Sequence, residues 1–335
     1  MRRDHGQGRT SDAARGRGRS RIQPDVEAAA AVIAGRLTRT PLLGSSTLGA
    51  AFGGRGYLKA ELFQKTGSFK ARGVVTKLAS LSPEEKERGV ISISAGNHAQ
   101  ALAWACTAEG IDCLLVTWRD ASPLKVAATK AYGATVDQEA ADHLEAFERV
   151  EALRNESGRT LVHPFDDPYV VAGQGTVGLE IGEELPDVDV VVVPVGGGGL
   201  VSGIATALPG KRIVAVEPEG STALHSGLEA GKPVPLPPKS IADALNAPIV
   251  GQLPLEICSA LGIESILLTE EEIRAGFRFL YERAKLAAEP GGAAAVAALL
   301  AAKVPDVEGK TVVAVVSGGI VATETAAAIL SSNEA

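Results

Sequence analysis

The sequence predicts an α/β fold in which helices cover both faces of parallel β-sheet layers, a doubly wound arrangement. Short apolar runs rich in β-branched residues are typical of strands buried on both faces of a parallel sheet. Stretches with helical periodicity separate these runs, so the chain alternates strand and helix. The expected strands are 90–93, 113–116, 188–193, 213–216, 266–268 and 312–316, and the expected helices are 100–109, 123–131, 144–156, 175–184, 271–284 and 293–303.

Length and composition limit the class of protein. The 335 residues suffice for two domains or for one large α/β domain. Hydrophobic residues make up 45% and charged residues 22%, as in globular proteins, and no apolar run is long enough to span a membrane. We therefore expect a cytoplasmic protein without membrane contact. Cys106, Cys113 and Cys258 form no C-x-x-C pair and lie in apolar stretches, so we expect buried thiols.

The first 21 residues differ from the rest of the chain. They carry seven arginines and two aspartates, whereas the whole chain has a formal net charge of −7. Richness in Gly, Ser and Arg without apolar periodicity predicts a disordered arm; a transit peptide and a nucleic-acid contact are the alternatives. Because the remainder is acidic, we expect no nucleic-acid partner for the protein as a whole.

Several elements are marked by local signals. Apolar residues at helical spacing predict a helix within 24–37, and residues 57–60 read as a strand. Ser122 before Pro123 supplies an N-cap and a first-turn proline, and Thr269 with Glu272 forms a capping box. The proline-rich stretch 232–238 is expected to be a surface connection.

Lys70 follows the run 57–60 and Gly67, and Ser68 is the expected N-cap of a helix that begins beside it. The positive end of the helix dipole disfavours an ammonium group, so the amine should deprotonate readily, as Schiff-base chemistry requires. A single lysine is most often a solvated surface residue. The assignment of Lys70 therefore depends on the segments that accompany it.

A run of four glycines, Gly196, Gly197, Gly198 and Gly199, connects an expected strand to a helix that continues through Leu200. Backbone N–H groups without neighbouring Cβ atoms, at a positive helix end, form an anion cradle suited to phosphate. A P-loop is excluded because no Gly-Lys-Ser/Thr follows. A nicotinamide dinucleotide site remains an alternative because Glu217 ends the next strand, although the glycine spacing does not complete that fingerprint.

Two further turns follow expected strands. Ser94, Ala95, Gly96, Asn97 and His98 form a turn whose N–H groups can hold a carboxylate, and the Asn97 amide can reach a ring oxygen. Ser317 begins the third turn, Ser317-Gly318-Gly319. Such loops converge at the carboxyl ends of parallel strands. A lysine, a phosphate cradle, a carboxylate cradle and a serine together indicate pyridoxal 5'-phosphate with a small amino-acid substrate.

These residues resemble the fold-type II pyridoxal-phosphate enzymes, and within them the threonine/serine dehydratases and serine racemase, over residues 38–321. The segments that carry the resemblance are 39–42, 66–73, 94–98, 132–134, 163–167, 173–176, 196–199, 217–220, 241–243, 289–290 and 317–319. The resemblance implies a tryptophan synthase β-like fold of two doubly wound three-layer domains and a homodimer. It places a large cofactor-binding domain at 22–54 plus 161–335, and a small substrate-closing domain at 55–160.

The resemblance also implies residue roles. Lys70 would form the internal aldimine and act as the Cα base, Phe69 would pack by the ring, and Asn97 would bond the ring hydroxyl. Residues 196–200 would hold the phosphate, residues 94–98 the substrate, and Ser317 would face the pyridine nitrogen. A neutral hydroxyl there makes the ring a weaker electron sink, which favours prompt loss of a β-substituent. The expected reaction is dehydration and deamination of L-threonine or L-serine to a 2-oxo acid and ammonia.

Departures from the family pattern leave alternatives. Ala95 stands where racemases carry a second, proton-donating serine, which favours a dehydratase over a racemase. Ala223 stands where racemases have an aspartate ligand, so no metal site is expected, although Glu217 remains a candidate ligand. Ala244 and Ile320 replace a glycine and an asparagine and suggest a tighter pocket, hence another pyridoxal-phosphate lyase with a specialised substrate. A non-catalytic ligand-binding protein is the remaining alternative.

Overall fold

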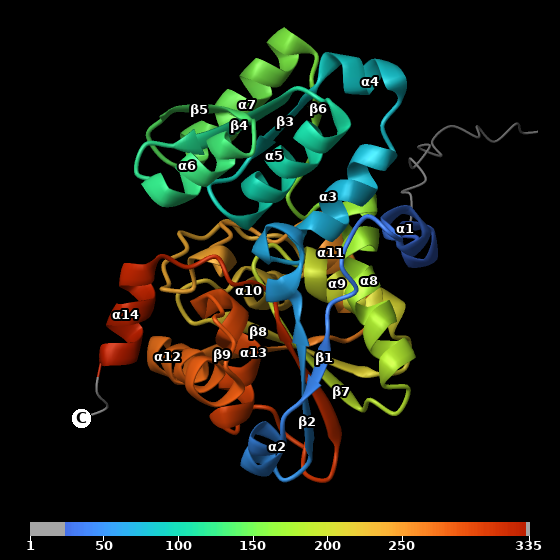
Figure 1. The fold of residues 1–335 in the computed structure, drawn as a ribbon, viewed down its shortest axis with the longest axis vertical. Helices are drawn as coiled ribbons and strands as arrows, with labels where there is room; N and C mark the ends of the chain where they lie inside the picture. Colours follow the sequence, from blue (N-terminus) through green and yellow to red (C-terminus); the bar gives the residue numbers. More distant parts are fainter. Residues whose placement is uncertain (1–23, 333–335) are drawn as a thin grey trace, which may run out of the picture.

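The computed structural model describes residues 24–332, which form two β-sheets flanked by helices (Figure 1). The larger sheet has the strand order β1-β2-β10-β7-β8-β9 and the smaller one the order β5-β4-β3-β6. The expected arm, residues 1–21, lies outside the described residues. The strands are β1 (Leu42–Gly44), β2 (Arg55–Ala60), β3 (Val90–Ile93), β4 (Cys113–Trp118), β5 (Thr135–Ala140), β6 (Thr160–Leu161), β7 (Val190–Pro194), β8 (Arg212–Pro218), β9 (Glu264–Leu268) and β10 (Thr311–Val316).

Helices alternate with these strands. The α-helices are α1 (Val26–Ile33), α2 (Ser46–Phe52), α3 (Lys70–Ala79), α4 (Pro83–Arg88), α5 (Asn97–Glu109), α6 (Pro123–Ala131), α7 (His143–Ser157), α8 (Pro168–Glu184), α9 (Gly199–Ala207), α10 (Ala223–Ala230), α11 (Gln252–Ala260), α12 (Glu270–Phe279), α13 (Pro290–Leu300) and α14 (Thr323–Ser331). Short helical turns are η1 (Glu61–Phe63), η2 (Lys65–Gly67), η3 (Asp243–Leu245) and a π-helical turn, η4 (Leu280–Ala284).

The strand pairing confirms the α/β prediction. Strand pairs within residues 24–332 are parallel, except that β1 runs antiparallel to β2 at the edge of the larger sheet. Each of the six predicted apolar runs coincides largely or wholly with a strand. Strands β1, β5 and β6 were not predicted: β1 and β6 are only three and two residues long, and the residues of β5, Thr-Val-Asp-Gln-Glu-Ala, are mostly polar, as suits an edge strand.

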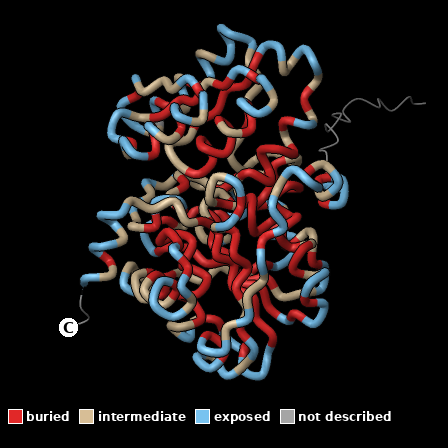
Figure 2. The backbone as a smooth tube through the Cα atoms, viewed as in Figure 1, coloured by how far each residue is buried: buried red, intermediate tan, exposed pale blue. Residues whose placement is uncertain are grey.

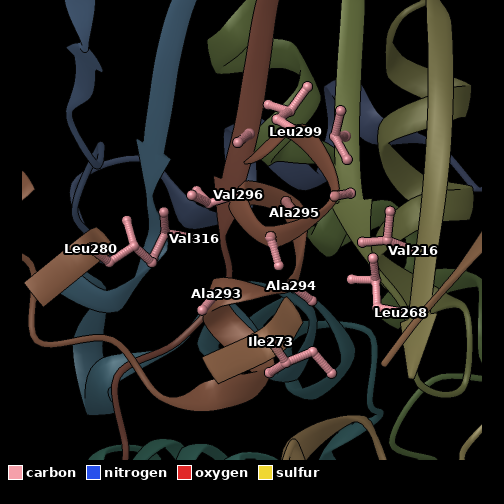
Figure 3. Packing of buried hydrophobic residues seen from close by; sticks show 14 of the residues in the cluster. Val216, Leu268, Ile273, Leu280, Ala293, Ala294, Ala295, Val296, Leu299 and Val316 are labelled. Carbon is pink, nitrogen blue, oxygen red and sulfur yellow. The ribbon is translucent and has the colours of Figure 1, made fainter. Parts of the chain in front are cut away.

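Each sheet has a hydrophobic core on both faces. In the larger sheet, α12 and α13 pack on one face and α8, α9 and α11 on the other; in the smaller sheet, α5 packs on one face and α7 on the other. Buried backbone accordingly runs through the middle of both layered parts (Figure 2). Figure 3 shows α13, whose Ala293, Ala294 and Ala295 let it lie close to strand residues such as Val316. A helix buried on all sides needs small apolar residues in this way.

β2 belongs to the larger sheet. It pairs in parallel with β10 of that sheet, from Arg55 beside Thr311 to Ala60 beside Val316. The small domain predicted from residue 55 onward thus begins with a strand of the larger sheet. The smaller sheet comprises β3 to β6, which lie within residues 90–161. The division of the chain into two domains stays a prediction.

One expected helix cap is corrected. Helix α3 begins at Lys70 with Phe69 in the N-cap position, while Ser68 is extended and forms a bridge with Gly318. Ser122 is the N-cap of α6 and Pro123 lies in its first turn, as predicted, although the Ser122 side chain makes no cap hydrogen bond. The capping box of Thr269 and Glu272 is confirmed. Ser317 is followed by a loop rather than directly by a helix, since α14 begins only at Thr323.

Helix α3, which carries Lys70 in its first position, is seated on α8 by close backbone contact. A Cβ atom on Gly173 of α8 would lie 2.5 Å from the carbonyl oxygen of Arg72, and one on Gly73 would lie 2.8 Å from that of Val170. Only glycine permits this approach. The position of the Lys70 backbone is thereby fixed against the larger sheet's helical layer.

Candidate active site

The carboxyl ends of β2, β10 and β7 lie at one edge of the larger sheet, and the segments that follow them meet there. They line a cavity together with Asn97 from the start of α5. Among the cavity's lining residues are Phe69, Lys70, Asn97, Gly196, Gly197, Gly198, Gly199, Leu200 and Ser317, which are all the residues that the sequence analysis predicted for the cofactor.

Lys70 projects into this cavity from the first position of α3. Its Nζ donates to the carbonyl oxygen of Pro164 at 3.0 Å and lies 5.2 Å from the centre of the Phe69 ring. Burial of the amine lowers the pKa of Lys70 to about 8, against a smaller opposing effect of the Glu289 charge. A substantial fraction of the amine is therefore neutral near physiological pH, as a nucleophile or base requires.

The glycine loop forms a cradle at the start of α9. Gly198 is the N-cap, in a left-handed conformation with φ of 92°, and it provides no side-chain cap, so the first N–H groups of α9 are left for another acceptor. A Cβ atom on Gly197 would lie 2.2 Å from the Phe165 ring. The loop thus has to be glycine for packing reasons as well as for anion access, and it fits a phosphate group.

Asn97 and Glu289 form a buried pair in the wall of the same cavity. The Asn97 Nδ2 donates to Glu289 Oε1 at 2.6 Å, and the two residues are 7% and 1% exposed. Burial raises the pKa of Glu289 to about 7. Ser317 is buried, and its carbonyl oxygen accepts from the Phe69 N–H at 3.2 Å, which ties the Lys70 segment to the end of β10.

A second cavity, which is more open to solvent, adjoins the first. The two share Lys70, Asn97, Pro164, Phe165, Gly197 and Ala244. The predicted substrate residues Ser94, Ala95, Gly96, Asn97 and His98 all line this second cavity. Gly96 caps α5 without a side-chain hydrogen bond, so the first N–H groups of α5 can hold a carboxylate beside Lys70.

The His98 ring lines this cavity but has a structural setting. Its Nε2 lies 3.0 Å from the Ser92 hydroxyl, and the residue is 2% exposed. Burial, and to a lesser extent the charge of Lys70, lower the pKa of His98 to about 3. The imidazole is therefore neutral in the physiological range and does not supply a charge to the substrate.

Pro164, Phe165 and Glu289 are among the lining residues that were not predicted as site residues. Pro164 and Phe165 follow β6 and contact Lys70 and Gly197, and Glu289 precedes α13. The segments 163–167 and 289–290 carried part of the family resemblance, and Pro290 marks a helix start immediately after Glu289. A long carboxylate that reaches away from its own helix cannot be recognised from that signal alone.

Ala244 and Ile320, the two residues that depart from the family pattern near the cofactor, differ in their position relative to the cavity. Ala244 lines both cavities, as expected of a residue near the cofactor. Ile320 instead packs behind the Lys70 segment, where its Cγ1 would lie 3.3 Å from a Cβ atom on Gly67. It is not among the described residues that line either cavity. The expectation that Ile320 narrows the pocket directly is therefore not supported by its position.

Glu217 is satisfied by the protein itself. Its carboxylate accepts from the N–H groups of Leu224 and His225, each at 2.8 Å, and from the Ser265 hydroxyl at 2.6 Å. Over the described part of the chain, no group of three or more His, Cys, Asp or Glu side chains is placed to hold a metal ion. Cys106, Cys113 and Cys258 are buried free thiols, as predicted. No helix within residues 24–332 is long and apolar enough to cross a membrane.

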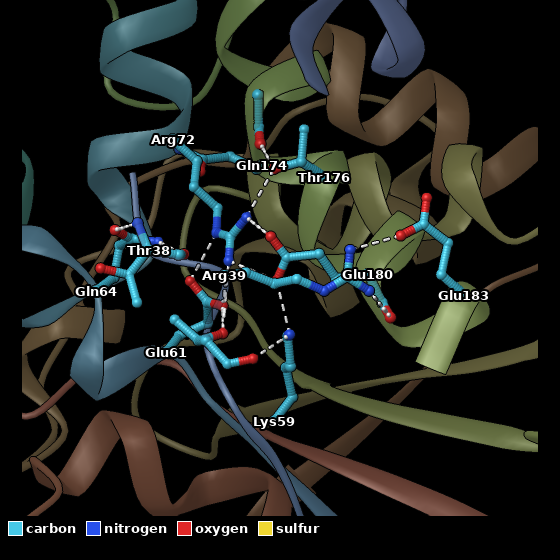
Figure 4. Close-up of polar contacts among 12 residues, drawn as sticks. Thr38, Arg39, Lys59, Glu61, Gln64, Arg72, Gln174, Thr176, Glu180 and Glu183 are labelled. Carbon is cyan, nitrogen blue, oxygen red and sulfur yellow. Dashed lines mark hydrogen bonds and ion pairs between the residues drawn. The ribbon is translucent and has the colours of Figure 1, made fainter. Parts of the chain in front are cut away.

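A buried ionic network lies beside the cavity, two residues along α3 from Lys70 (Figure 4). Arg72 donates to both oxygens of Glu61 and to both oxygens of Glu180, at 2.7 to 2.9 Å. Lys59 joins it through Glu180 at 2.7 Å. This network, Lys59, Glu61, Arg72 and Glu180, connects β2, η1, α3 and α8.

Comparison with known protein families agrees with this geometry. A family model described as pyridoxal-phosphate dependent enzyme matches residues 33–318, which include every segment that lines the first cavity. The chain belongs to this family. The resemblance to fold-type II pyridoxal-phosphate enzymes is thereby confirmed, and so is the dependence on pyridoxal phosphate.

Individual relatives and solved structures refine the placement. The chain is 43% identical over 300 residues to the L-threonine ammonia-lyase of Thermotoga maritima, covering 88% of this chain and 74% of that one. It is 42% identical over 306 residues to the catabolic L-threonine dehydratase TdcB of Staphylococcus aureus, covering 88% of each. Maize serine racemase superposes with a TM-score of 0.85 at 36% identity, covering 90% of this chain and 94% of that one. The threonine deaminase of T.th. superposes with a TM-score of 0.82 at 39% identity, covering 89% and 97%.

Proposed function

We propose that the protein is a pyridoxal-phosphate-dependent ammonia-lyase that dehydrates and deaminates L-threonine or L-serine to a 2-oxo acid and ammonia. The observation that carries this proposal is the convergence of a partly neutral Lys70 with an anion cradle and a helix start in adjoining cavities. The similarity to the threonine ammonia-lyase and dehydratase above supports the substrate class.

Each part of the site has a task in this reaction. When bound, pyridoxal phosphate supplies the electron sink that acidifies the substrate Cα–H and lets the β-hydroxyl leave. The α9 start and residues 196–200 would hold its phosphate, and Phe69, Asn97 and Ser317 would border its ring. The α5 start would hold the substrate carboxylate. The Lys70 amine would accept the Cα proton, because its lowered pKa leaves it partly neutral.

The side chain at position 95 favours elimination over racemisation. Racemisation requires a proton donor on the face opposite the Cα base, and Ala95 lines the substrate cavity without any such group. An amino-acid racemase is the second candidate, supported by the similarity to maize serine racemase. The experiment separates the two: the purified protein loaded with pyridoxal phosphate should release ammonia and 2-oxo acid from L-threonine or L-serine. Interconversion of serine enantiomers at a comparable rate would contradict the assignment.

A screen of β-hydroxy amino acids for ammonia release tests the substrate class. A clear preference for unsubstituted L-threonine or L-serine is expected. A preference for another β-substituted amino acid would support a specialised lyase. If the visible absorbance band of the bound cofactor shifted when an amino acid was added, but no ammonia was released, a non-catalytic binder would be supported. A change in nicotinamide absorbance on adding substrate would support an oxidoreductase.

We also propose, from the family resemblance, a cytoplasmic homodimer in which the part around β3 to β6 closes on the substrate. The shared cavity between that part and the larger sheet's loops supports the closing motion. Light scattering on the purified protein tests the dimer, and small-angle scattering with and without substrate tests the closure. A monomer, or a radius of gyration that does not change with substrate, would contradict them.

A further inference from the structure

Glu289 is a buried carboxylate that the reaction as described above leaves without a role. It occupies the N-cap position of α13, but its side chain makes no cap hydrogen bond to that helix. Carboxylates at this position normally accept from the first N–H groups of the helix. Here the side chain points away from α13 and lines the cofactor cavity, at 1% exposure.

The partner of Glu289 comes from the other layered part of the molecule. Glu289 Oε1 accepts from Nδ2 of Asn97, the first residue of α5, at 2.6 Å, and Asn97 lines both cavities. An amide side chain can rotate about its last bond unless its partners hold it. An ionised carboxylate can only accept, so in that form Glu289 orients the Asn97 amide with the nitrogen toward itself.

The backbone beneath this pair is shaped for it. A Cβ atom on Gly318 would lie 2.3 Å from Glu289 Oε1 and 3.1 Å from Asn97 Nδ2. The Glu289 N–H in turn donates to the Gly318 carbonyl oxygen at 3.0 Å. Gly318 also forms the bridge with Ser68, two residues before Lys70. Glu289 is therefore tied both to Asn97 and to the backbone that carries Ser317 and Lys70.

The electrostatic surroundings are compatible with a hydrogen bond that persists over the working pH range. Two cations face Glu289, Lys125 from α6 and Lys70 from α3, and one anion, Asp243 from η3, which itself pairs with Lys125. The cations favour the ionised carboxyl group and Asp243 disfavours it. The accepting oxygen toward Asn97 is available in either protonation state.

We propose that Glu289 is a positioning residue: its hydrogen bond fixes the Asn97 amide against the Ser317–Gly318 backbone, and the fixed amide is what the cofactor ring meets. This inference rests on the proposed use of the cavity for pyridoxal phosphate. Glu289 acts through Asn97 and need not touch substrate. Loss of the hydrogen bond leaves a buried amide unsatisfied and free to rotate, which weakens its contact with any ring bound beside it.

The test uses the full chain reconstituted with pyridoxal phosphate and compares Glu289→Leu with Glu289→Gln. We expect Glu289→Leu to raise the dissociation constant for pyridoxal phosphate by about tenfold or more and to shift the absorbance maximum of the bound cofactor. Glu289→Gln keeps an accepting oxygen of similar reach, so affinity and spectrum should return to within about threefold of the unmodified protein.

Glu217 provides the matched control. It is an equally buried carboxylate with a pKa that burial raises, but it lines neither cavity among the described residues. Glu217→Leu should lower stability without shifting the cofactor spectrum. Equal spectral shifts for Glu217→Leu and Glu289→Leu would overturn the proposal, because the effect would then be general.

A double-mutant cycle tests whether Glu289 acts through Asn97. Asn97→Ala and the pair Asn97→Ala/Glu289→Leu should bind pyridoxal phosphate equally weakly, since Glu289 acts only through Asn97. Gly318→Ala, whose Cβ would displace Glu289 Oε1, should reproduce the spectral shift. A Glu289→Leu protein with unchanged affinity and spectrum, or a Glu289→Gln protein as impaired as Glu289→Leu, would refute the proposal. If the unmodified protein bound no pyridoxal phosphate, the proposed function itself would fail instead.

Discussion

Lys70 and Arg72 are two basic side chains on the first turn of the same helix, and their surroundings shift their pKa values in opposite directions. The half-buried Lys70 amine donates to one backbone carbonyl at 3.0 Å, and burial lowers its pKa to about 8. The Arg72 guanidinium is fully buried, but the carboxylates of Glu61 and Glu180 outweigh the effect of burial and raise its pKa. The reactive side chain, Lys70, thus lies only two residues from Arg72, which anchors the helix.

The contrast between Lys70 and Arg72 explains how the fold tolerates an amine in an electrostatically unfavourable position. A buried ammonium without a counter-ion is costly, and a helix start makes it more so. The Arg72 network and the glycine contacts between α3 and α8 hold the backbone of that turn whether or not Lys70 is charged. Lys70 can therefore be left poorly paired without the helix moving.

The largest expected effect on activity comes from removing the amine of Lys70. Lys70→Met should abolish ammonia release from L-threonine, by at least about 10⁴-fold in kcat/KM, because it removes the amine that is proposed to accept the Cα proton. Stability in urea should not fall, since the substitution removes a buried, poorly paired amine. Steady-state kinetics and equilibrium unfolding measure the two quantities.

Lys70→Arg is the control for charge. It keeps the positive charge but stays protonated, so it should be as inactive as Lys70→Met. Substantial turnover by either variant would show that the assignment of Lys70 is wrong.

Removing Arg72 should have the opposite effect to removing Lys70, namely a large loss of stability. Arg72→Met leaves the buried carboxylates of Glu61 and Glu180 without their main partner and should lower the free energy of unfolding by about 3–5 kcal/mol. Urea denaturation monitored by circular dichroism measures this loss. The combined variant Arg72→Met/Glu61→Gln should recover part of it, because Glu61 then carries no uncompensated charge and Glu180 keeps its ion pair with Lys59. If Arg72→Met were as stable as the unmodified protein, the network would not be the anchor of α3.

The two residues also show where sequence reasoning succeeds and where it stops. The Lys70 neighbourhood was predictable, because the glycine run and the turns at 94–98 and 317–319 follow apolar strands at recognisable positions, and each of these segments contributes to the lining of the cavities. Arg72 could not be interpreted, because its partners lie 11 and 108 positions away along the chain. Pairings between charges so distant in sequence appear only once the fold brings them together.

The same limit applies to Glu289 and to the helix caps. Glu289 lies 192 positions from Asn97, and nothing local to either residue indicates the other. Ser68 had the sequence of an N-cap, but tertiary pairing with Gly318 holds it extended, so α3 begins at Lys70 without a side-chain cap. β5 lacks the apolar run that predicted strands such as β3, β4, β7 and β10. Local signals predicted the elements, and long-range contacts decided their ends.

The pH dependence of pyridoxal-phosphate binding tests whether the pKa of Lys70 is lowered while that of Arg72 is not. The expected effect is smaller than those of Lys70→Met and Arg72→Met. Bond formation with an aldehyde needs a neutral amine, and the neutral fraction of Lys70 rises as pH passes its pKa of about 8. The rate at which the cofactor-free protein captures pyridoxal phosphate should therefore increase about tenfold between about pH 7 and pH 9. Stopped-flow absorbance measures it. A midpoint near the ordinary lysine pKa would mean that burial does not act on this amine.

The smallest effect tests whether the Arg72 network is redundant. Thr176 contributes a single neutral acceptor to Arg72, at 3.1 Å, beside the charged contacts from Glu61 and Glu180. Thr176→Val removes that acceptor with little change in volume and should lower the free energy of unfolding by only about 1 kcal/mol, with kcat for L-threonine unchanged. A large fall in kcat with a small loss of stability would mean that the network tunes Lys70 rather than merely anchoring its helix. An unchanged kcat would instead mean that the network stabilises α3 without affecting the reactivity of Lys70. The carboxylates of Glu61 and Glu180 would then be enough to hold the first turn of α3, which carries Lys70.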